Sequence, residues 1–318
     1  MSEGQAKMEK MCIVMTGFSC NNNCIVCSVK PFSKTNKDKT TAEIIAIMKK
    51  KRESGAVNIE FTGGEPTMRK DIVFLVQSAK KMGFKEIAVS TNARLFSYEP
   101  FLNAMIDAGL TRVTATLDGG NERLHDAITR TPGAFKQTTS GIRNLISRGI
   151  TTSVNTVFTK LNVNNLSEIA ERLIEMRVPV WGVLDLIPDG NIKEAYKSSC
   201  VSFAETREAL RTIYSYIDRL SMIELFDFPV CAIPPEMYAD KARVIHFDAY
   251  GRMNVLDQVG YGPQRFEEKD GFFEDEHKIR VEACQKCSRV KECGGIWSRH
   301  YERFGEEDIR FTENNYLK

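Results

Sequence analysis

The sequence lacks any long apolar run. None of its hydrophobic stretches approaches the roughly 18 residues that a membrane-spanning helix needs. The first residues, MSEGQAKMEKMCIVMTGF, mix charges and lack the apolar centre of a secretory signal peptide. These absences predict a cytoplasmic protein with no membrane association.

The chain also lacks an excess of charge of either sign. It has 44 Lys and Arg residues against 42 Asp and Glu residues, a formal net charge of +2. This balance offers no electrostatic case for nucleic acid or an anionic membrane as partner. The basic run at 49–52 falls late in a predicted helix, where cations suit the helix dipole, so we interpret it as a solvated helix end.

Internal repeats and low-complexity tracts are absent, and strand-like and helix-like segments alternate instead. Strand-like segments lie at 11–18, 56–62, 86–92, 111–120, 151–158 and 179–190. Helix-like segments lie at 40–55, 71–84, 98–110, 122–130, 134–148 and 164–178. Six successive β-then-α units predict a parallel sheet with helical crossovers, either an open doubly wound sheet or a barrel of about six strands.

The regular alternation of strand-like and helix-like segments ends after about residue 190. A long amphipathic helix over 203–220 precedes a Pro-rich link at 226–237, and 243–256 resembles a β-hairpin turning at Tyr250-Gly251. A cysteine-rich loop, CQKCSRVKEC, follows. We therefore expect a tail over 1–10, a barrel domain over 11–225 and a small second domain over 226–318.

Nine cysteines are present, and in a reducing compartment clustered thiols predict metal sites before disulfides. Cys20, Cys24 and Cys27 lie just after the first strand, where α/β folds carry their sites. A tetrahedral zinc site would need a fourth ligand, and the nearest histidine, His125, is distant in sequence. A [4Fe–4S] cluster on three thiolates would leave one iron open to bind a ligand. Cys12, inside an apolar strand, is expected to be a core residue.

The C-x3-C-x2-C spacing resembles the signature of the radical S-adenosylmethionine (SAM) enzymes, although Val26 replaces an aromatic residue frequent there. The resemblance implies that Cys20, Cys24 and Cys27 hold a reactive [4Fe–4S] cluster whose open iron chelates SAM. It implies reductive cleavage of SAM to a 5′-deoxyadenosyl radical that abstracts hydrogen from a substrate. A low-potential electron donor, ferredoxin or flavodoxin, is implied as partner.

A second match is TGGEP at the end of the next strand. In the family this motif holds the amino group of SAM, which implies that role for Gly63, Gly64 and Glu65. Further polar residues at strand ends resemble the family's contacts to SAM, and an Arg one position after the usual place would meet the SAM carboxylate. These residues are Ser90, Asn92, Thr116, Asp118, Asn155 and Arg130.

The C-terminal trio Cys284, Cys287 and Cys293 resembles part of the SPASM extension, which holds two auxiliary clusters. Two expected cysteine positions are Leu256 and Trp297 instead, and both belong to the same auxiliary cluster. We therefore expect one auxiliary [4Fe–4S] cluster, as in the shorter twitch relatives, with Cys231 as the one plausible fourth thiolate. Were Cys231 too distant, one iron of this cluster would be open and substrate could bind it directly. By spacing alone, a structural zinc site remains an alternative.

These observations predict a partial (β/α)6 TIM-like barrel with a small SPASM/twitch-like auxiliary domain. We expect a peptide or protein as substrate, because many SPASM-like relatives modify peptides. Biosynthesis of a small molecule or cofactor is the alternative, since only about ten residues precede the first strand and leave no room for a peptide-recognition domain. The C-terminal NNYLK lacks the Gly-Arg-Arg pattern of the molybdopterin enzyme. An alternative of another class is a non-catalytic iron–sulfur protein for electron transfer or sensing.

Asp185 and Asp189 flank the end of the sixth strand. They could face the substrate or act as a base, but Asp189-Gly190 is equally an ordinary turn pair.

Overall fold

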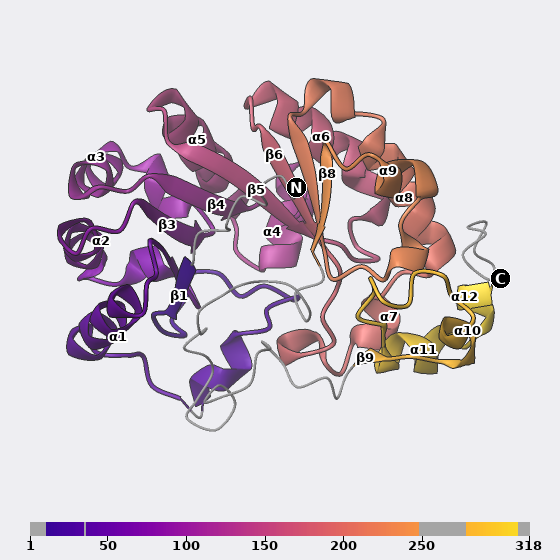
Figure 1. Ribbon diagram of the computed structural model, residues 1–318. Helices are drawn as coiled ribbons and strands as arrows, with labels where there is room; N and C mark the ends of the chain where they lie inside the picture. The colour runs from indigo at the N-terminus through magenta and orange to yellow at the C-terminus, as the bar shows by residue number, and fades with distance from the viewer. Residues whose placement is uncertain (1–10, 35, 248–277, 311–318) are drawn as a thin grey trace, which may run out of the picture.

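The computed structural model describes residues 11–34, 36–247 and 278–310. Its centre is a parallel sheet of eight strands that neighbour one another in chain order. Figure 1 shows the sheet curving as a half-barrel with helices on its outer side. The strands are β1 (Met11–Met15), β2 (Asn58–Thr62), β3 (Glu86–Thr91), β4 (Arg112–Thr116), β5 (Thr151–Val157), β6 (Val180–Leu184), β7 (Met222–Phe226) and β8 (Val244–Phe247).

Helices connect these strands, and most of them form the outer layer. The connecting helices are α1 (Thr41–Glu53), α2 (Ile72–Lys81), α3 (Glu99–Ala108), α4 (Glu122–Thr129), α5 (Ala134–Ser147), α6 (Leu166–Glu175), α7 (Tyr196–Ser199), α8 (Phe203–Tyr214) and α9 (Pro235–Ala239). The short α7 lies instead beside the C-terminal segment. Short 3-10 turns include η1 (Lys30–Lys34), η2 (Pro66–Met68) and η5 (Gly190–Ile192).

The main core lies between the sheet and this helical layer. On β2 and β6, for example, alternate residues Ile59, Phe61, Trp181 and Val183 are buried there. Alternation along a strand sends the intervening residues to the opposite, concave face. That face therefore receives polar side chains such as Ser90 and Asn155, both partly exposed.

The sheet has two more strands than the six expected from the sequence. The expected barrel end at residue 225 falls inside β7, and β8 continues the sheet to Phe247. The start of the expected hairpin is β8, which pairs parallel with β7 through the crossover that contains α9. The expected turn at Tyr250-Gly251 lies outside the described residues. The pattern missed β7 because MIELF follows a helical stretch without a clear turn signal.

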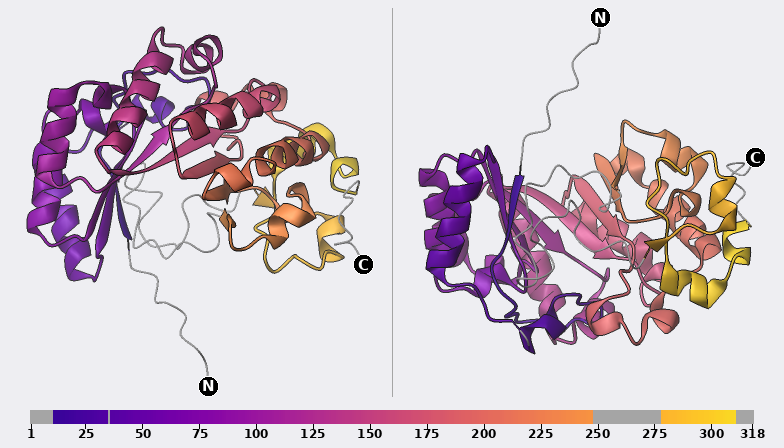
Figure 2. Two further views of the ribbon diagram at one scale, coloured as in Figure 1. Left: turned by 90° about the horizontal axis from the view of Figure 1, so that it is seen from above. Right: turned by 60° about the horizontal axis from the view of Figure 1, so that its bottom comes forward.

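The described C-terminal segment packs beside the last part of the sheet (Figure 2). It contains an antiparallel ribbon of β9 (Lys278–Ile279) and β10 (Ile296–Trp297), with α10 (Glu282–Gln285), α11 (Ser298–Phe304) and α12 (Glu307–Arg310). Two of its helices contact the barrel, α11 against α7 and α12 against α8. Across the described ranges, no helix combines the length and apolarity needed to cross a membrane.

Candidate functional site

The cysteine loop leaves β1 at its carboxyl end and is bonded to the turn that follows β2. The backbone N–H of Gly64 donates to the Gly17 carbonyl and that of Glu65 to the Ser19 carbonyl, each at 2.8 Å. A Cβ on Gly64 would lie 2.3 Å from the Ser19 oxygen, and one on Gly63 would lie 2.4 Å from the Gly17 oxygen. The two glycines are therefore required by the close approach of two backbones.

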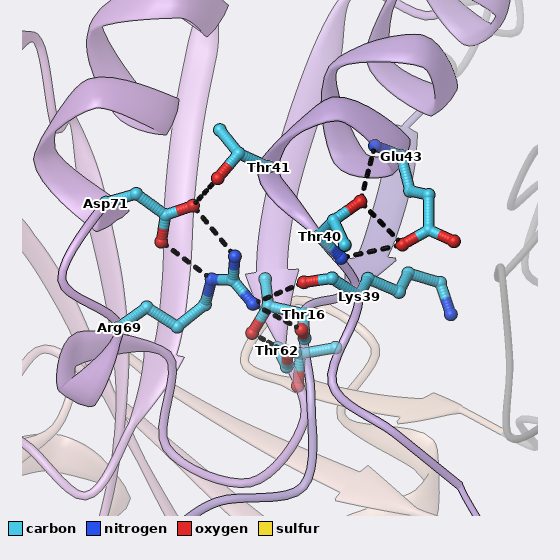
Figure 3. A network of polar contacts seen from close by, with 8 residues as sticks. All are labelled: Thr16, Lys39, Thr40, Thr41, Glu43, Thr62, Arg69 and Asp71. Atoms are coloured by element: carbon cyan, nitrogen blue, oxygen red, sulfur yellow. Dashed lines mark hydrogen bonds and ion pairs between the residues drawn. The ribbon is translucent and has the colours of Figure 1, made fainter.

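One arginine holds both ends of the cysteine loop (Figure 3). Arg69 donates from one nitrogen to the carbonyls of Thr16, at 2.9 Å, and Lys39, at 2.8 Å. Its other two nitrogens bind the Asp71 carboxylate at 2.9 and 2.8 Å, and Thr41 donates to the same carboxylate at 2.6 Å. Since Thr16 and Lys39 bracket the whole loop, Arg69 closes its base. No sequence pattern indicated a role for this residue.

A second arginine orients the loop near the first cysteine. Arg94 donates to the Asn21 carbonyl and the Asn22 side chain, both at 2.7 Å, and to Gln137 at 2.7 Å. Asn92 donates to the Asn21 side chain at 2.6 Å. Arg94 was also missed, although it follows the STN strand end by only two residues.

The far side of the loop rests on α4 and on the turn after β6. The backbone N–H groups of Asn23 and Ile25 donate to the carbonyls of Thr129 and Ile128, each at 2.9 Å. Asn191 donates to the Cys27 carbonyl through its backbone and to the Cys24 carbonyl through its side chain, each at 2.9 Å. These contacts fix the backbone on both sides of Cys24.

The three thiols of the loop lie near one another and are partly buried. Burial raises the pKa of Cys20 to about 11, and the neighbouring charges of Glu65 and Cys27 add to that shift. Burial also raises the pKa of Cys24, helped by the Asp118 carboxylate and the other two thiols. Backbone N–H groups of Asn22 and Lys30 donate to the Cys20 and Cys27 sulfurs at 3.3 Å. Gathered thiols of this kind favour binding of a metal centre, which would deprotonate them.

Glu65 is almost completely buried and joins β2 to β3. One carboxylate oxygen accepts from the Thr67 backbone, the Thr67 hydroxyl and the Thr91 hydroxyl at 3.0, 2.6 and 2.7 Å. The other accepts from the Asn92 backbone at 2.7 Å, its one bond among the described residues. Burial raises the pKa of Glu65. The second oxygen thus keeps capacity for another donor.

Asp118 is the second buried carboxylate beside the loop. One of its oxygens accepts from the Val157 backbone at 2.9 Å. Burial raises its pKa to about 6. Its charge in turn raises the pKa of Cys24, so the carboxylate lies near that thiol.

The remaining expected SAM contacts are less closely gathered. Thr116 and Asn155 are paired neighbours on the concave face, and Gly182 leaves room for the Asn155 side chain. Ser90 donates instead to Glu60 on the same face. Arg130 is exposed at the left-handed C-cap of α4, with φ of 50°. Of these four, the structure brings none into a described contact with the cysteine loop.

A second group of thiols lines a pocket between the turn after β7 and the C-terminal segment, where about 490 Å³ of space includes open solvent. Its wall includes Cys231, Cys284, Cys287 and Cys293. Burial raises the pKa of Cys231, and the charges of the other three thiols raise it further. Backbone N–H groups of Arg289 and Gly295 donate to the Cys287 and Cys293 sulfurs at 3.4 Å. In the described parts of the chain, no three His, Cys, Asp or Glu side chains form a group ready to hold a single metal ion.

The ribbon of β9 and β10 separates this pocket from the strand ends of the barrel. Ile296 lines the pocket, whereas its neighbour Trp297 belongs to an apolar cluster with Ile25 and Val26 of the cysteine loop. The Trp297 indole donates to Asp185 at 3.1 Å. Buried Lys278 lies 3.6 Å from Asp227 and over the Trp297 ring.

The other residues singled out in the sequence have ordinary contacts. Asp185 also accepts from the Leu186 backbone, and burial raises its pKa to about 6. Asp189 accepts from the Gly190 backbone at 2.7 Å, as in a turn. Cys12 is buried in the main core, and Cys200 packs in the cluster with Trp297.

Comparison with known proteins identifies relatives of the barrel. The family model "Radical SAM superfamily" matches residues 14–173. The AdoMet-dependent heme synthase of Oleidesulfovibrio alaskensis is 28% identical over 205 residues, covering 64% of this chain and 52% of that protein. A "Probable GTP 3',8-cyclase" of Sulfurisphaera tokodaii is 29% identical over 179 residues, covering 56% of each. The chain thus spans about half the length of the curated relatives it matches.

Solved structures share the fold over nearly the whole chain. Streptococcus suis SuiB bound to S-adenosylmethionine has a TM-score of 0.61 and 15% identity, covering 98% of this chain and 77% of that one. Native anSMEcpe with bound AdoMet has a TM-score of 0.63 and 13% identity, covering 97% and 93%. At these identities the likeness concerns the fold alone.

Proposed function

The chain belongs to the radical SAM superfamily, whose enzymes use a [4Fe–4S] cluster and SAM, and from this premise we propose that its cysteine loop and the Gly-Gly-Glu-Pro turn form the SAM-cleaving site. One observation carries the proposal. The turn after β2 is bonded backbone to backbone to the cysteine loop, with both glycines at the contact. A thiol cluster with an adjacent buried carboxylate suits a metal centre and an ammonium group together.

Each residue near the loop has a defined part in this proposal. Cys20, Cys24 and Cys27 would ligate the cluster and leave one iron open for SAM. Glu65 would accept a hydrogen bond from the SAM ammonium through the oxygen that has a single described bond. Thr116 and Asn155 lie on the concave face and Asp118 lies near Cys24, and the nucleoside would lie between them. When bound, the cluster and SAM supply the radical chemistry, while the protein supplies orientation and excludes water.

For the second pocket we propose one auxiliary [4Fe–4S] cluster on four thiolates. The support is the pocket that unites Cys231, which is distant in sequence, with Cys284, Cys287 and Cys293. Four protein ligands would close every iron, so substrate would not bind this cluster directly. A four-cysteine zinc site is the alternative, and metal counting separates the two.

Two substrate classes have support. A peptide is the expectation from the SPASM-like cysteines, and a structural neighbour is SuiB bound to its precursor peptide SuiA, at a TM-score of 0.56. A small molecule is favoured by the curated relatives named heme synthase and GTP 3',8-cyclase, which are closer in sequence. We propose hydrogen abstraction from substrate in either case.

Anaerobic reconstitution with iron and sulfide, followed by addition of SAM and dithionite, tests the function. The enzyme should release 5′-deoxyadenosine, and Cys24→Ala should abolish the release. Cys200→Ala, a buried thiol outside both groups, should retain it. A non-catalytic electron-transfer or sensor protein would release none in any variant, and that result would refute the proposal.

A further inference from the structure

Charged groups of both signs lie near the thiols of the cysteine loop. The Glu65 carboxylate acts on Cys20 and the Asp118 carboxylate on Cys24. Next to Cys27, the backbone N–H of Lys30 bonds the Cys27 sulfur at 3.3 Å, and its ammonium group binds Asn23 at 2.6 Å. SAM would lie beside the carboxylates, so an electron donor would approach the loop past Lys30.

Three segments adjoin one another next to Lys30. The turn η1, which begins three residues after Cys27, contacts η5, and α7 contacts α11. Gly190 lies against the backbone of Cys27 and Ser28, where a Cβ would approach within 2.4 Å. Arg299 donates to the Lys193 carbonyl at 2.5 Å, and Arg303 to the Lys197 carbonyl at 3.2 Å. Figure 1 shows α7 and α11 side by side at the lower edge of the molecule.

Basic side chains dominate these three segments. Residues 30–34, 190–199 and 298–304 contain six Lys and Arg residues but two acidic ones, Glu194 and Glu302. Glu302 pairs with Lys197 at 3.1 Å. The whole chain, in contrast, has nearly equal numbers of basic and acidic residues. We define the basic surface as Lys30, Lys34, Lys193, Lys197, Arg299 and Arg303, all exposed or partly exposed.

We propose that the basic surface docks an acidic one-electron carrier protein, flavodoxin-like in charge, which reduces the cluster held by the cysteine loop. The inference rests on the proposed function, because a reductant is needed only if the loop holds that cluster. In the step, the carrier loses one electron and the cluster gains it, with no bond made or broken. Complementary charge would steer the carrier to the face closest to Cys27, and salt would weaken the encounter.

Charge reversal away from the metal ligands tests the proposal. The test protein carries Lys34→Glu, Lys193→Glu and Lys197→Glu. The matched control carries the same charge change at exposed lysines of α1 and α2: Lys49→Glu, Lys50→Glu and Lys81→Glu. Binding of an acidic flavodoxin is measured by biolayer interferometry at low and high salt. Reduction by flavodoxin hydroquinone and by dithionite is followed anaerobically through the visible absorbance.

We expect the test variant to bind flavodoxin roughly tenfold more weakly at low salt and to lose most of its salt dependence. Its reduction by flavodoxin should slow in parallel, whereas its reduction by dithionite should match wild type. Equal weakening in the control, or unchanged binding in the test variant, would overturn the proposal. An oligonucleotide that binds the surface as tightly as flavodoxin would also overturn it, since the surface would then be a general polyanion site.

The two proposals fail separately. If wild type releases 5′-deoxyadenosine with dithionite but the basic surface does not affect flavodoxin binding, the docking site is wrong and the SAM-cleaving function stands. If wild type releases none with dithionite, the proposed function itself is wrong.

Discussion

Gly64→Ala should detach the turn after β2 from the cysteine loop. The added Cβ would lie 2.3 Å from the Ser19 oxygen and 2.6 Å from the carbonyl carbon and oxygen of Phe18. All three are backbone atoms, so no side-chain rotation relieves the overlap. Separation would strain the two hydrogen bonds that Gly64 and Glu65 donate to the loop. Overpacking and two weakened bonds together predict a loss of roughly 2–6 kcal/mol in the free energy of unfolding.

The measurement is urea unfolding of the metal-free variant under reducing conditions, together with iron retained after reconstitution and desalting. Gly149→Ala is the matched control. Gly149 has a φ of 75° and no atom near a new Cβ, so alanine there should cost about 1–2 kcal/mol through backbone conformation alone. It should leave iron retention unchanged. If Gly64→Ala is no more destabilising than this control and retains its iron, the contact between turn and loop does not support the site.

Three further predictions concern other parts of the molecule. Cys231→Ser should lower the iron content from about eight to about four per chain, whereas loss of zinc with constant iron would support a zinc site and unchanged metal would exclude this ligand. Arg69→Lys should lower the free energy of unfolding by about 2 kcal/mol, because an ammonium group cannot reproduce the guanidinium's bonds to two carbonyls and a carboxylate. Urea unfolding measures this loss, and an unchanged urea midpoint would show that the loop base does not depend on Arg69. Asp185 has a pKa raised by burial from 3.8 to about 6, so its protonated form favours the fold; this contribution is complete below pH 3.8 and is lost as the pH rises through about 6. Asp185→Asn should therefore reduce the fall in urea midpoint between pH 4 and pH 7 relative to wild type, and an identical fall would refute the assignment. The other charged groups acting on this carboxyl are His300, Lys278 and Asp227.

The first six strands were predictable because each shows a β-branched apolar run followed by an amphipathic helix. The seventh was not, since β7 follows a helical stretch without a clear turn signal, and β8 was expected only as the start of a hairpin. The parallel pairing of β8 depends on a crossover through α9, and a local hairpin pattern cannot reveal that.

The cysteines were found from spacing because their chemistry requires that residue type. Arg69, Arg94 and Asn191 were missed because they bind backbone carbonyls of sequence-distant segments, which any residue can present. Cys231 was named by elimination among the cysteines. Its place in the second pocket follows from the turn after β7, a strand that the sequence pattern did not show.

The Arg69 clamp has a consequence for how the cofactor is acquired. Joining the ends of a long, irregular segment has an entropic cost, and here one guanidinium joins Thr16 to Lys39. Assembly of a cluster would then have to order only the interior of the segment. The clamp therefore lowers the entropic cost of binding a cluster, because the protein itself holds the two ends of the segment together.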